Sequence, residues 1–99
     1  MKKLNILRKV SDFIEKMPNA DSGKLLAHLK FLELNKPEVL LIKTLRKKIK
    51  EIIIAQYRII FFVINDTIYV VDVFRKKSQK TPISVIRQAE KIYKELHEQ

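Results

Sequence analysis

The spacing of apolar residues predicts two helices near the start of the chain. Within residues 4–17 the apolar positions recur at intervals of three and four, which is typical of an amphipathic helix. Pro18-Asn19 ends this pattern, and Asp21 or Ser22 can cap a second helix over residues 21–35. We expect the two helices to form a helical hairpin. Their predicted buried residues are Ile6, Val10, Phe13, Ile14 and Met17 in the first helix, and Leu25, Leu26, Leu29, Phe31 and Leu32 in the second.

The middle of the chain has the pattern of β-strands. Residues 49–54, 57–64 and 67–74 are rich in β-branched and aromatic side chains, which favour strands. The link Asn65-Asp66 suits a tight hairpin turn, because both residue types tolerate a positive φ. Residues 38–48 are ambiguous between a helical turn and a strand.

A tight turn at Asn65-Asp66 would fix which residues face each other across the hairpin. Ile64 would pair with Thr67, and each further pair would step one residue outwards on both strands. Arg58 would then lie opposite Val73 and diagonal to Arg75. One face would show Arg58, Ile60, Phe62, Tyr69 and Val71, and the other Tyr57, Ile59, Phe61, Val63, Ile68, Val70, Asp72 and Phe74.

Both faces of this hairpin are largely apolar, so both need cover. The helical hairpin can cover one face, and a C-terminal helix or a partner protein can cover the other. That last helix follows Thr81-Pro82, with Thr81 as its predicted cap and Pro82 in its first turn. Its apolar stripe is Val85, Ile86, Ala89, Ile92, Tyr93 and Leu96.

These elements predict an α+β fold. We expect a single domain over residues 1–99, in which an N-terminal helical hairpin packs on a small antiparallel sheet of three to four strands with a C-terminal helix.

Arg58 stands out as an arginine in the middle of an apolar strand. It could form a buried ion pair, for example with Glu51. Alternatively, Arg58 and Arg75 converge on a bound anion, because two arginines placed diagonally repel each other without one. Both hypotheses remain open from the sequence.

The charge points to an anionic partner. Twenty-one Lys and Arg residues stand against 11 Asp and Glu residues, giving a net charge of +10. Such an excess favours nucleic acid, an anionic membrane or an acidic protein. We expect no membrane partner and a cytoplasmic protein, because no run approaches the ~20 apolar residues of a membrane helix and residues 4–10 do not form a signal-peptide core. The absence of cysteine excludes disulfides and thiolate metal sites.

The positive charge is concentrated in two tracts. One holds Arg75, Lys76, Lys77 and Lys80, and the other holds Lys43, Arg46, Lys47, Lys48 and Lys50. Lysines at sheet edges commonly prevent aggregation, but that role needs only one or two charges. Contacts with phosphates would use this many. Tyr57, Phe62 and Tyr69 could stack on bases, or they could be core residues.

The familiar catalytic and metal-binding patterns are missing from the sequence. His28 and His97 are far apart, and we expect both to be surface residues. There is no metal-ligand spacing, glycine-rich phosphate loop or serine elbow, so we expect neither a metal nor a cofactor. Cleavage of RNA by its own 2′-hydroxyl needs only cations for the phosphate and a group that moves a proton.

Three stretches form a distinctive pattern: YRIIFFV at 57–63, IYVV at 68–71 and FRKKSQKTP at 74–82. They resemble the RelE superfamily, and within it the HigB-type, phage-derived branch of toxins. The resemblance implies a toxin of a type II toxin–antitoxin module, a ribosome-dependent endoribonuclease (mRNA interferase) that inhibits translation by cutting mRNA in the decoding site of the small ribosomal subunit. It also implies a helix-turn-helix antitoxin of the HigA type as a partner.

The resemblance also implies roles for individual residues. Arg58 matches the strand arginine that contacts the scissile phosphate, and Glu51 matches the glutamate of the family's E-L-R strand. Lys76, Lys77 and Lys80 match its basic run beside the cleavage site. The predicted catalytic residues are Arg58, Arg75, Lys77 and Glu51, and the predicted RNA contacts are Lys47, Lys48, Lys76, Gln79 and Lys80.

The chain departs from the family pattern in ways that leave other functions open. The E-L-R triplet is Glu51-Ile52-Ile53 here, without its arginine, and Asp72-Val73 stands where the family often has His and Gly. Only residues 1–7 precede the first predicted helix, so we expect the family's first strand to be shortened or absent. A ParE-like protein that poisons gyrase, an inactive binding module of the same fold, and a basic protein that coats nucleic acid are the alternatives.

Overall fold

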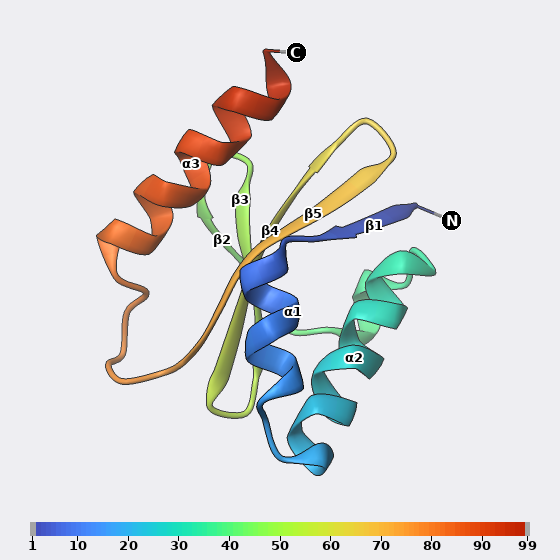
Figure 1. The fold of residues 1–99 in the computed structure, drawn as a ribbon. Coiled ribbons are helices and arrows are strands. Elements are labelled where there is room, and N and C mark those ends of the chain that lie inside the picture. The colour runs from blue at the N-terminus through green and yellow to red at the C-terminus, as the bar shows by residue number, and fades with distance from the viewer. Residues whose placement is uncertain (1, 99) are drawn as a thin grey trace.

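The computed structural model describes residues 2–98 and contains one five-stranded sheet with helices on both sides (Figure 1). The strand order is β1-β5-β4-β3-β2, with β1 parallel to β5 and all other neighbours antiparallel. The α+β class is therefore confirmed, but the sheet has five strands instead of three to four. Along the chain the elements are β1 (Lys3–Ile6), α1 (Arg8–Glu15), α2 (Asn19–Glu33), the 3₁₀ turn η1 (Pro37–Val39), β2 (Ile42–Arg46), β3 (Ile49–Ile54), β4 (Tyr57–Ile64), β5 (Thr67–Arg75) and α3 (Ile83–His97).

The beginning of the chain forms a strand where the apolar spacing predicted a helix. Lys3 pairs with Thr67 and Ile6 with Val70, so β1 adds a short parallel edge to β5. Helix α1 begins only at Arg8. The family's first strand was expected to be shortened or absent, and the structure has a strand of four residues, β1, before the first helix. The ambiguous residues 38–48 form η1 and the opposite edge strand β2.

Three two-residue turns join β2 to β5 without a glycine. Lys47, Ala55 and Asn65 each occupy the first turn position with φ values of 50°, 52° and 55°. Asparagine adopts this left-handed conformation readily, whereas lysine and alanine adopt it at a cost of roughly 1–2 kcal/mol. The turn predicted at Asn65-Asp66 is confirmed by the pair Ile64 and Thr67.

A β-bulge changes the second half of the β4–β5 pairing. The predicted register holds from Ile64 opposite Thr67 to Phe61 opposite Val70. Ile60 then pairs with Asp72, which leaves Val71 as an extra residue in β5. An extra residue reverses the faces of the residues that follow it.

The bulge moves the β5 residues after Val71 away from their predicted positions. Val73 belongs to the core under α1 and α2, and Phe74 packs under α3, the reverse of the prediction. Arg58 faces Phe74, and Arg75 faces Tyr57. The predicted diagonal pair of Arg58 and Arg75 on one face is therefore wrong.

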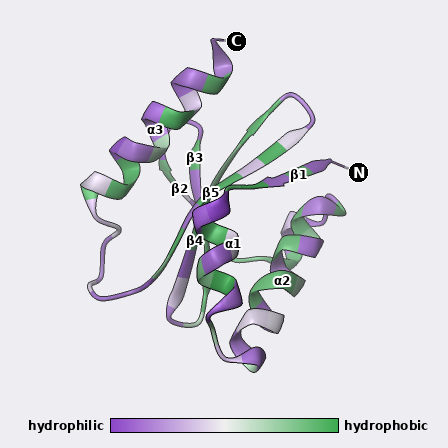
Figure 2. Cartoon of the chain, in the orientation of Figure 1, coloured by the Kyte–Doolittle hydropathy of each residue, from purple (hydrophilic) through white to green (hydrophobic). Residues whose placement is uncertain are grey.

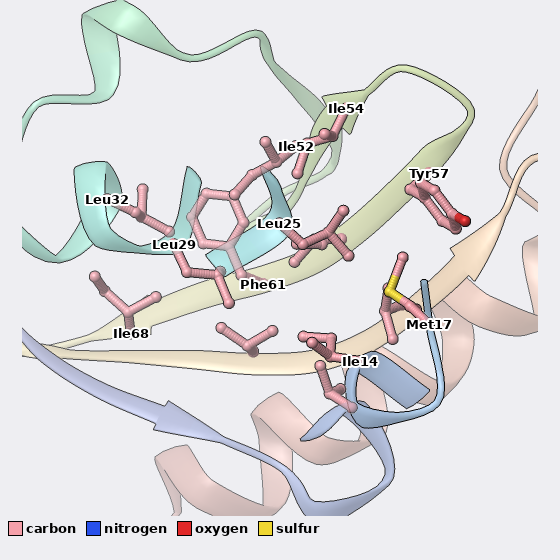
Figure 3. Packing of buried hydrophobic residues seen from close by; sticks show 14 residues of the cluster. Ile14, Met17, Leu25, Leu29, Leu32, Ile52, Ile54, Tyr57, Phe61 and Ile68 are labelled. Carbon is pink, nitrogen blue, oxygen red and sulfur yellow. The ribbon is translucent and has the colours of Figure 1, made fainter. Parts of the chain in front are cut away.

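Each face of the sheet carries its own apolar core. Helices α1 and α2 cover one face, here named the α1/α2 face, where Leu29, Ile52 and Phe61 are fully or almost fully buried (Figure 3). Helix α3 covers the other, the α3 face, where Phe62 packs edge-on against Tyr93 with ring centroids 5.1 Å apart. The stripe predicted for α3 is confirmed, so the chain itself covers the face for which a partner protein was an alternative.

Hydrophobic residues make up much of the strands, whereas the loop between β5 and α3 is largely hydrophilic (Figure 2). Helix α2 departs from its predicted pattern. Leu25, Leu29 and Leu32 are buried, but Leu26 and Phe31 are 50% and 40% exposed. Both face solvent because α2 contacts the rest of the molecule along a single narrow stripe.

Candidate nucleic-acid site

A groove of about 650 Å³ opens on the α3 face, beside the loop 76–82 that joins β5 to α3. It lies at the end of the sheet that carries the Ala55-Gln56 turn, where α3 no longer covers the strands. In Figure 1 the loop extends away from the sheet before α3 begins. The lining residues are Lys43, Thr44, Leu45, Glu51, Ile53, Arg58, Phe74, Arg75, Lys76, Lys77, Ser78, Gln79, Lys80, Thr81, Pro82, Ile83, Val85 and Ile86.

Seven of the nine predicted site residues line this groove. They are Glu51, Arg58, Arg75, Lys76, Lys77, Gln79 and Lys80. The other two, Lys47 and Lys48, form the exposed turn between β2 and β3 and do not line it. Their side chains are therefore separated from the groups that the structure gathers.

Lys43 is a groove residue that the predicted site did not include. It pairs with Glu51 across β2 and β3, so both point to the α3 face at the same level of the sheet. Lys43 belongs to the second basic tract, but the ambiguous pattern of residues 38–48 does not predict its strand. A correct β2–β3 pairing was the signal that could have identified it.

Arg58 is anchored to the backbone rather than to a carboxylate. Its Nη1 atom donates hydrogen bonds to the carbonyl oxygens of Ala55 at 2.9 Å and Tyr57 at 2.8 Å. These bonds hold the guanidinium against the β3–β4 turn at the edge of the groove. The hypothesis of an ion pair with Glu51 is wrong, since the ion pairs within residues 2–98 join other residues.

Arg75 reaches the groove from the end of β5. Arg75 is exposed and lies opposite Tyr57, and it is the last residue before the loop. The amide of the next residue, Lys76, donates to the carbonyl of Gln56 at 2.6 Å. This bond fixes the start of the basic loop to the same turn that holds Arg58.

Glu51 is the one buried charged residue within residues 2–98, with 3% of its surface exposed. The Oγ1 hydroxyl of Thr81 donates a hydrogen bond to its Oε1 atom. Thr81 was predicted to cap α3, but the N-cap position is Pro82 and no side chain caps the helix there. The hydrogen bond from Thr81 instead connects the end of the loop to Glu51 at the base of the groove.

The groove carries an unbalanced positive charge. Six cations line it, namely Lys43, Arg58, Arg75, Lys76, Lys77 and Lys80, against the single carboxylate of Glu51. Within residues 2–98 the three ion pairs are Lys9–Asp72, Lys30–Glu33 and Arg46–Glu90, and none involves a groove cation. Cations crowded into a concave surface without counter-charges attract an anion.

The aromatic and histidine candidates lie outside the groove. Phe62 is fully buried and Tyr69 packs against it, so both serve the core under α3. His28 bonds the carbonyl of Lys24, and His97 stacks on Tyr93 near the end of α3. Stacking of bases on Phe62 or Tyr69 would require α3 to move away.

Residues 12–94 match the family described as phage derived protein Gp49-like (DUF891). The chain belongs to this family. The match spans every residue that lines the groove, from Lys43 to Ile86. No curated protein matches the chain in sequence.

The Gp49-like chain is similar in fold to a chain of the archaeal RelE–RelB complex from Pyrococcus horikoshii OT3. The two share 16% sequence identity and a TM-score of 0.67, over 80% of this chain and 98% of that one. At this identity the likeness concerns the fold, which resembles RelE.

Within residues 2–98, no three His, Cys, Asp or Glu side chains cluster in a way that could hold a metal ion. In the same part of the chain, no helix is long and apolar enough to cross a membrane.

Proposed function

We propose that this Gp49-like protein is the toxin of a type II toxin–antitoxin module, a HigB-type endoribonuclease that cuts mRNA in the decoding site of the small ribosomal subunit. The observation that carries the proposal is the groove, where six cations surround one buried carboxylate. Family membership and the RelE-like fold support it.

The proposed reaction is attack of a ribose 2′-oxygen on the adjacent phosphorus. The bond from phosphorus to the 5′-oxygen breaks, and the products are a 2′,3′-cyclic phosphate and a 5′-hydroxyl. Negative charge accumulates on the phosphate oxygens in the transition state, so fixed guanidinium groups accelerate the step. Arg58, held by two backbone carbonyls, and Arg75 would supply this charge.

The remaining groove residues would bind the strand and move protons. Lys76, Lys80 and Gln79 on the loop would contact the flanking phosphates, with Lys43 on the opposite wall. Lys77 could protonate the leaving 5′-oxygen, and Glu51 could accept the 2′-hydroxyl proton because its carboxylate faces the groove. Lys47 and Lys48, on the exposed turn, would serve as outer contacts to ribosomal or messenger RNA.

The proposed partner is a helix-turn-helix antitoxin of the HigA type. The similar archaeal structure is described as a complex of RelE with RelB. An acidic antitoxin segment would complement the groove, whose six cations form no ion pair with any residue from 2 to 98.

Primer extension on cellular mRNA after brief induction tests the proposed activity. We compare the wild type, Arg58→Ala and a matched control, Arg87→Ala, which removes an exposed arginine of α3 outside the groove. We expect cuts within translated frames for the wild type and the control. Arg58→Ala should lose cleavage about 10²- to 10³-fold, the usual effect of removing one group that stabilises transition-state charge.

The other outcomes separate the alternatives. Cleavage by Arg58→Ala at the wild-type level would contradict the proposed site. Toxicity of the wild type without cuts, accompanied by DNA damage, would favour gyrase poisoning, and neither toxicity nor cuts would indicate an inactive copy. Ile53 lies directly opposite Arg58, at the position where the family pattern has an arginine. The groove therefore has one cation fewer than that pattern, which is the structural reason to consider gyrase poisoning and an inactive copy.

A further inference from the structure

A second hollow, of about 370 Å³, lies at the corner where α1 leads into α2. This volume is at the lower end of the range for small-molecule pockets. In Figure 1 the corner lies at the same end of the molecule as the β3–β4 turn. The lining residues are Phe13, Lys16, Met17, Pro18, Tyr57 and Arg75.

The walls of this hollow are apolar and aromatic. Tyr57 and Met17 belong to the core of the α1/α2 face, and Figure 3 shows the tyrosine hydroxyl directed away from that core. The hydroxyl donates a hydrogen bond to Oδ2 of Asp21 at 2.8 Å. This bond, together with burial, raises the pKa of Tyr57, so the ring stays neutral and its proton is already engaged.

The rim of the hollow is cationic and shares one residue, Arg75, with the groove. Lys16 and Arg75 are both exposed, and neither takes part in the ion pairs within residues 2–98. Arg75 lines the second hollow and the groove as well. A polyanion held in the groove therefore passes the second hollow when its strand continues around the end of β5.

We propose that the second hollow is a nucleobase subsite, which holds the base of a nucleotide adjacent to the one whose phosphate lies in the groove. This inference rests on the proposed RNA-binding function of the groove. Phe13, which is half-buried, offers aromatic surface for stacking beside the largely buried ring of Tyr57, and Lys16 and Arg75 pair with the phosphates on either side. Since the hydroxyl proton of Tyr57 is engaged by Asp21, the subsite stacks bases with little discrimination among them.

The test is binding of two fluorescein-labelled probes at low salt: a pentauridylate and an oligomer of equal length that lacks the bases. Phe13→Leu keeps apolar volume but removes the ring, so it should weaken pentauridylate binding about tenfold and leave the abasic oligomer unchanged. Phe31→Leu, which changes an exposed aromatic residue of α2 outside both hollows, is the matched control and should bind both probes like the wild type.

Arg58→Ala separates failure of the subsite from failure of the groove. If Arg58→Ala weakens binding of both probes while Phe13→Leu binds both like the wild type, the subsite is overturned and the groove stands. If Arg58→Ala also binds both probes like the wild type, the groove itself fails and the subsite fails with it.

A measurement on the unaltered protein makes the test independent of the folding of Phe13→Leu. Pentanucleotides with 4-thiouridine at each position in turn are cross-linked by light, and the adducts are mapped by mass spectrometry. Adducts within residues 13–18 or on Tyr57 at one position support the subsite. Adducts confined to residues 74–86 at every position would overturn it.

Discussion

The two faces of the sheet belong to the same strands, but their apolar cores extend to different distances along those strands. On the α1/α2 face, the core extends without interruption from Ile68 to Tyr57, so it reaches both ends of the β4–β5 hairpin. On the α3 face, the buried core around Phe62 and Val71 does not extend as far, and towards the Ala55-Gln56 turn it is continued only by the half-buried Phe74. The other end, with Ile53 and Arg58, opens into the groove.

The difference follows from the number of helices available to each face. Two helices cover the first face, whereas α3 alone covers the second and begins only after the loop 76–82. The uncovered end of the second face holds the charged and polar groups, which would be unfavourable under a helix. The α1/α2 face therefore contributes mainly to stability, whereas the α3 face exposes charged and polar side chains beyond the end of α3.

The largest effect should come from truncating a core residue on the sealed face. Leu29→Ala removes a side chain that is 1% exposed, and we expect a loss of about 3–5 kcal/mol in the free energy of unfolding because the cavity cannot collapse. Ile86→Ala, at the wall of the open groove, should lose only about 1–2 kcal/mol, because solvent can fill the space. Urea unfolding of both variants measures the difference. Equal losses of unfolding free energy would contradict the contrast between the α1/α2 face and the α3 face.

A smaller effect should come from removing the hydrogen bond between Thr81 and Glu51. Thr81→Val removes the hydroxyl that serves the buried Glu51 carboxylate, and leaving that group unpaired should cost about 1–3 kcal/mol. Glu51→Gln keeps an acceptor for Thr81 and removes the buried charge, so its stability should stay within about 1 kcal/mol of the wild type. Urea unfolding ranks the two variants. A larger loss for Glu51→Gln than for Thr81→Val would show that the carboxylate, not the hydrogen bond, stabilises this end of the sheet.

Sequence patterns predicted the elements whose contacts are local. The β4–β5 turn follows from Asn65-Asp66, and α3 follows from an apolar stripe that a single helix face can show. Strand β1 was missed because it has only four residues, because Ile6 also fits the three-and-four spacing of a helix, and because its pairing with β5 joins positions more than sixty residues apart. The bulge at Val71 was missed because the residues around it are apolar on both faces, so either register buries them.

The sequence predicted which residues lie together in the groove more completely than it predicted how they are arranged. The basic run from Arg75 to Lys80 is contiguous, so its residues had to lie near one another wherever the loop went. Its position next to Glu51 depends on the packing of α3, which the sequence pattern does not specify. Lys47 and Lys48 were included for their charge alone, and a tight turn carries them away from the groove.

Tyr57 and Arg58 are adjacent on β4 but belong to different faces. Tyr57 lies at the end of the α1/α2 face, and Arg58 lies on the α3 face. The hydrogen bond to Asp21 raises the pKa of Tyr57 in the folded protein above its ordinary value of about 10. A raised pKa favours the protonated form in the folded state. The stabilisation is therefore complete below about pH 10 and is lost as the pH rises above that value through the folded pKa.

Tyr57→Phe should thus lower the stability at neutral pH by a small amount that shrinks above about pH 10. Urea unfolding of the wild type and Tyr57→Phe at several pH values from about 8 to about 11 measures this difference. Tyr69→Phe, which removes a hydroxyl from the α3 face, is the matched control. A stability difference between the wild type and Tyr57→Phe that stays constant across this range would mean that the bond to Asp21 does not stabilise the protonated hydroxyl. The corner between α1 and α2 would then be held by apolar packing alone.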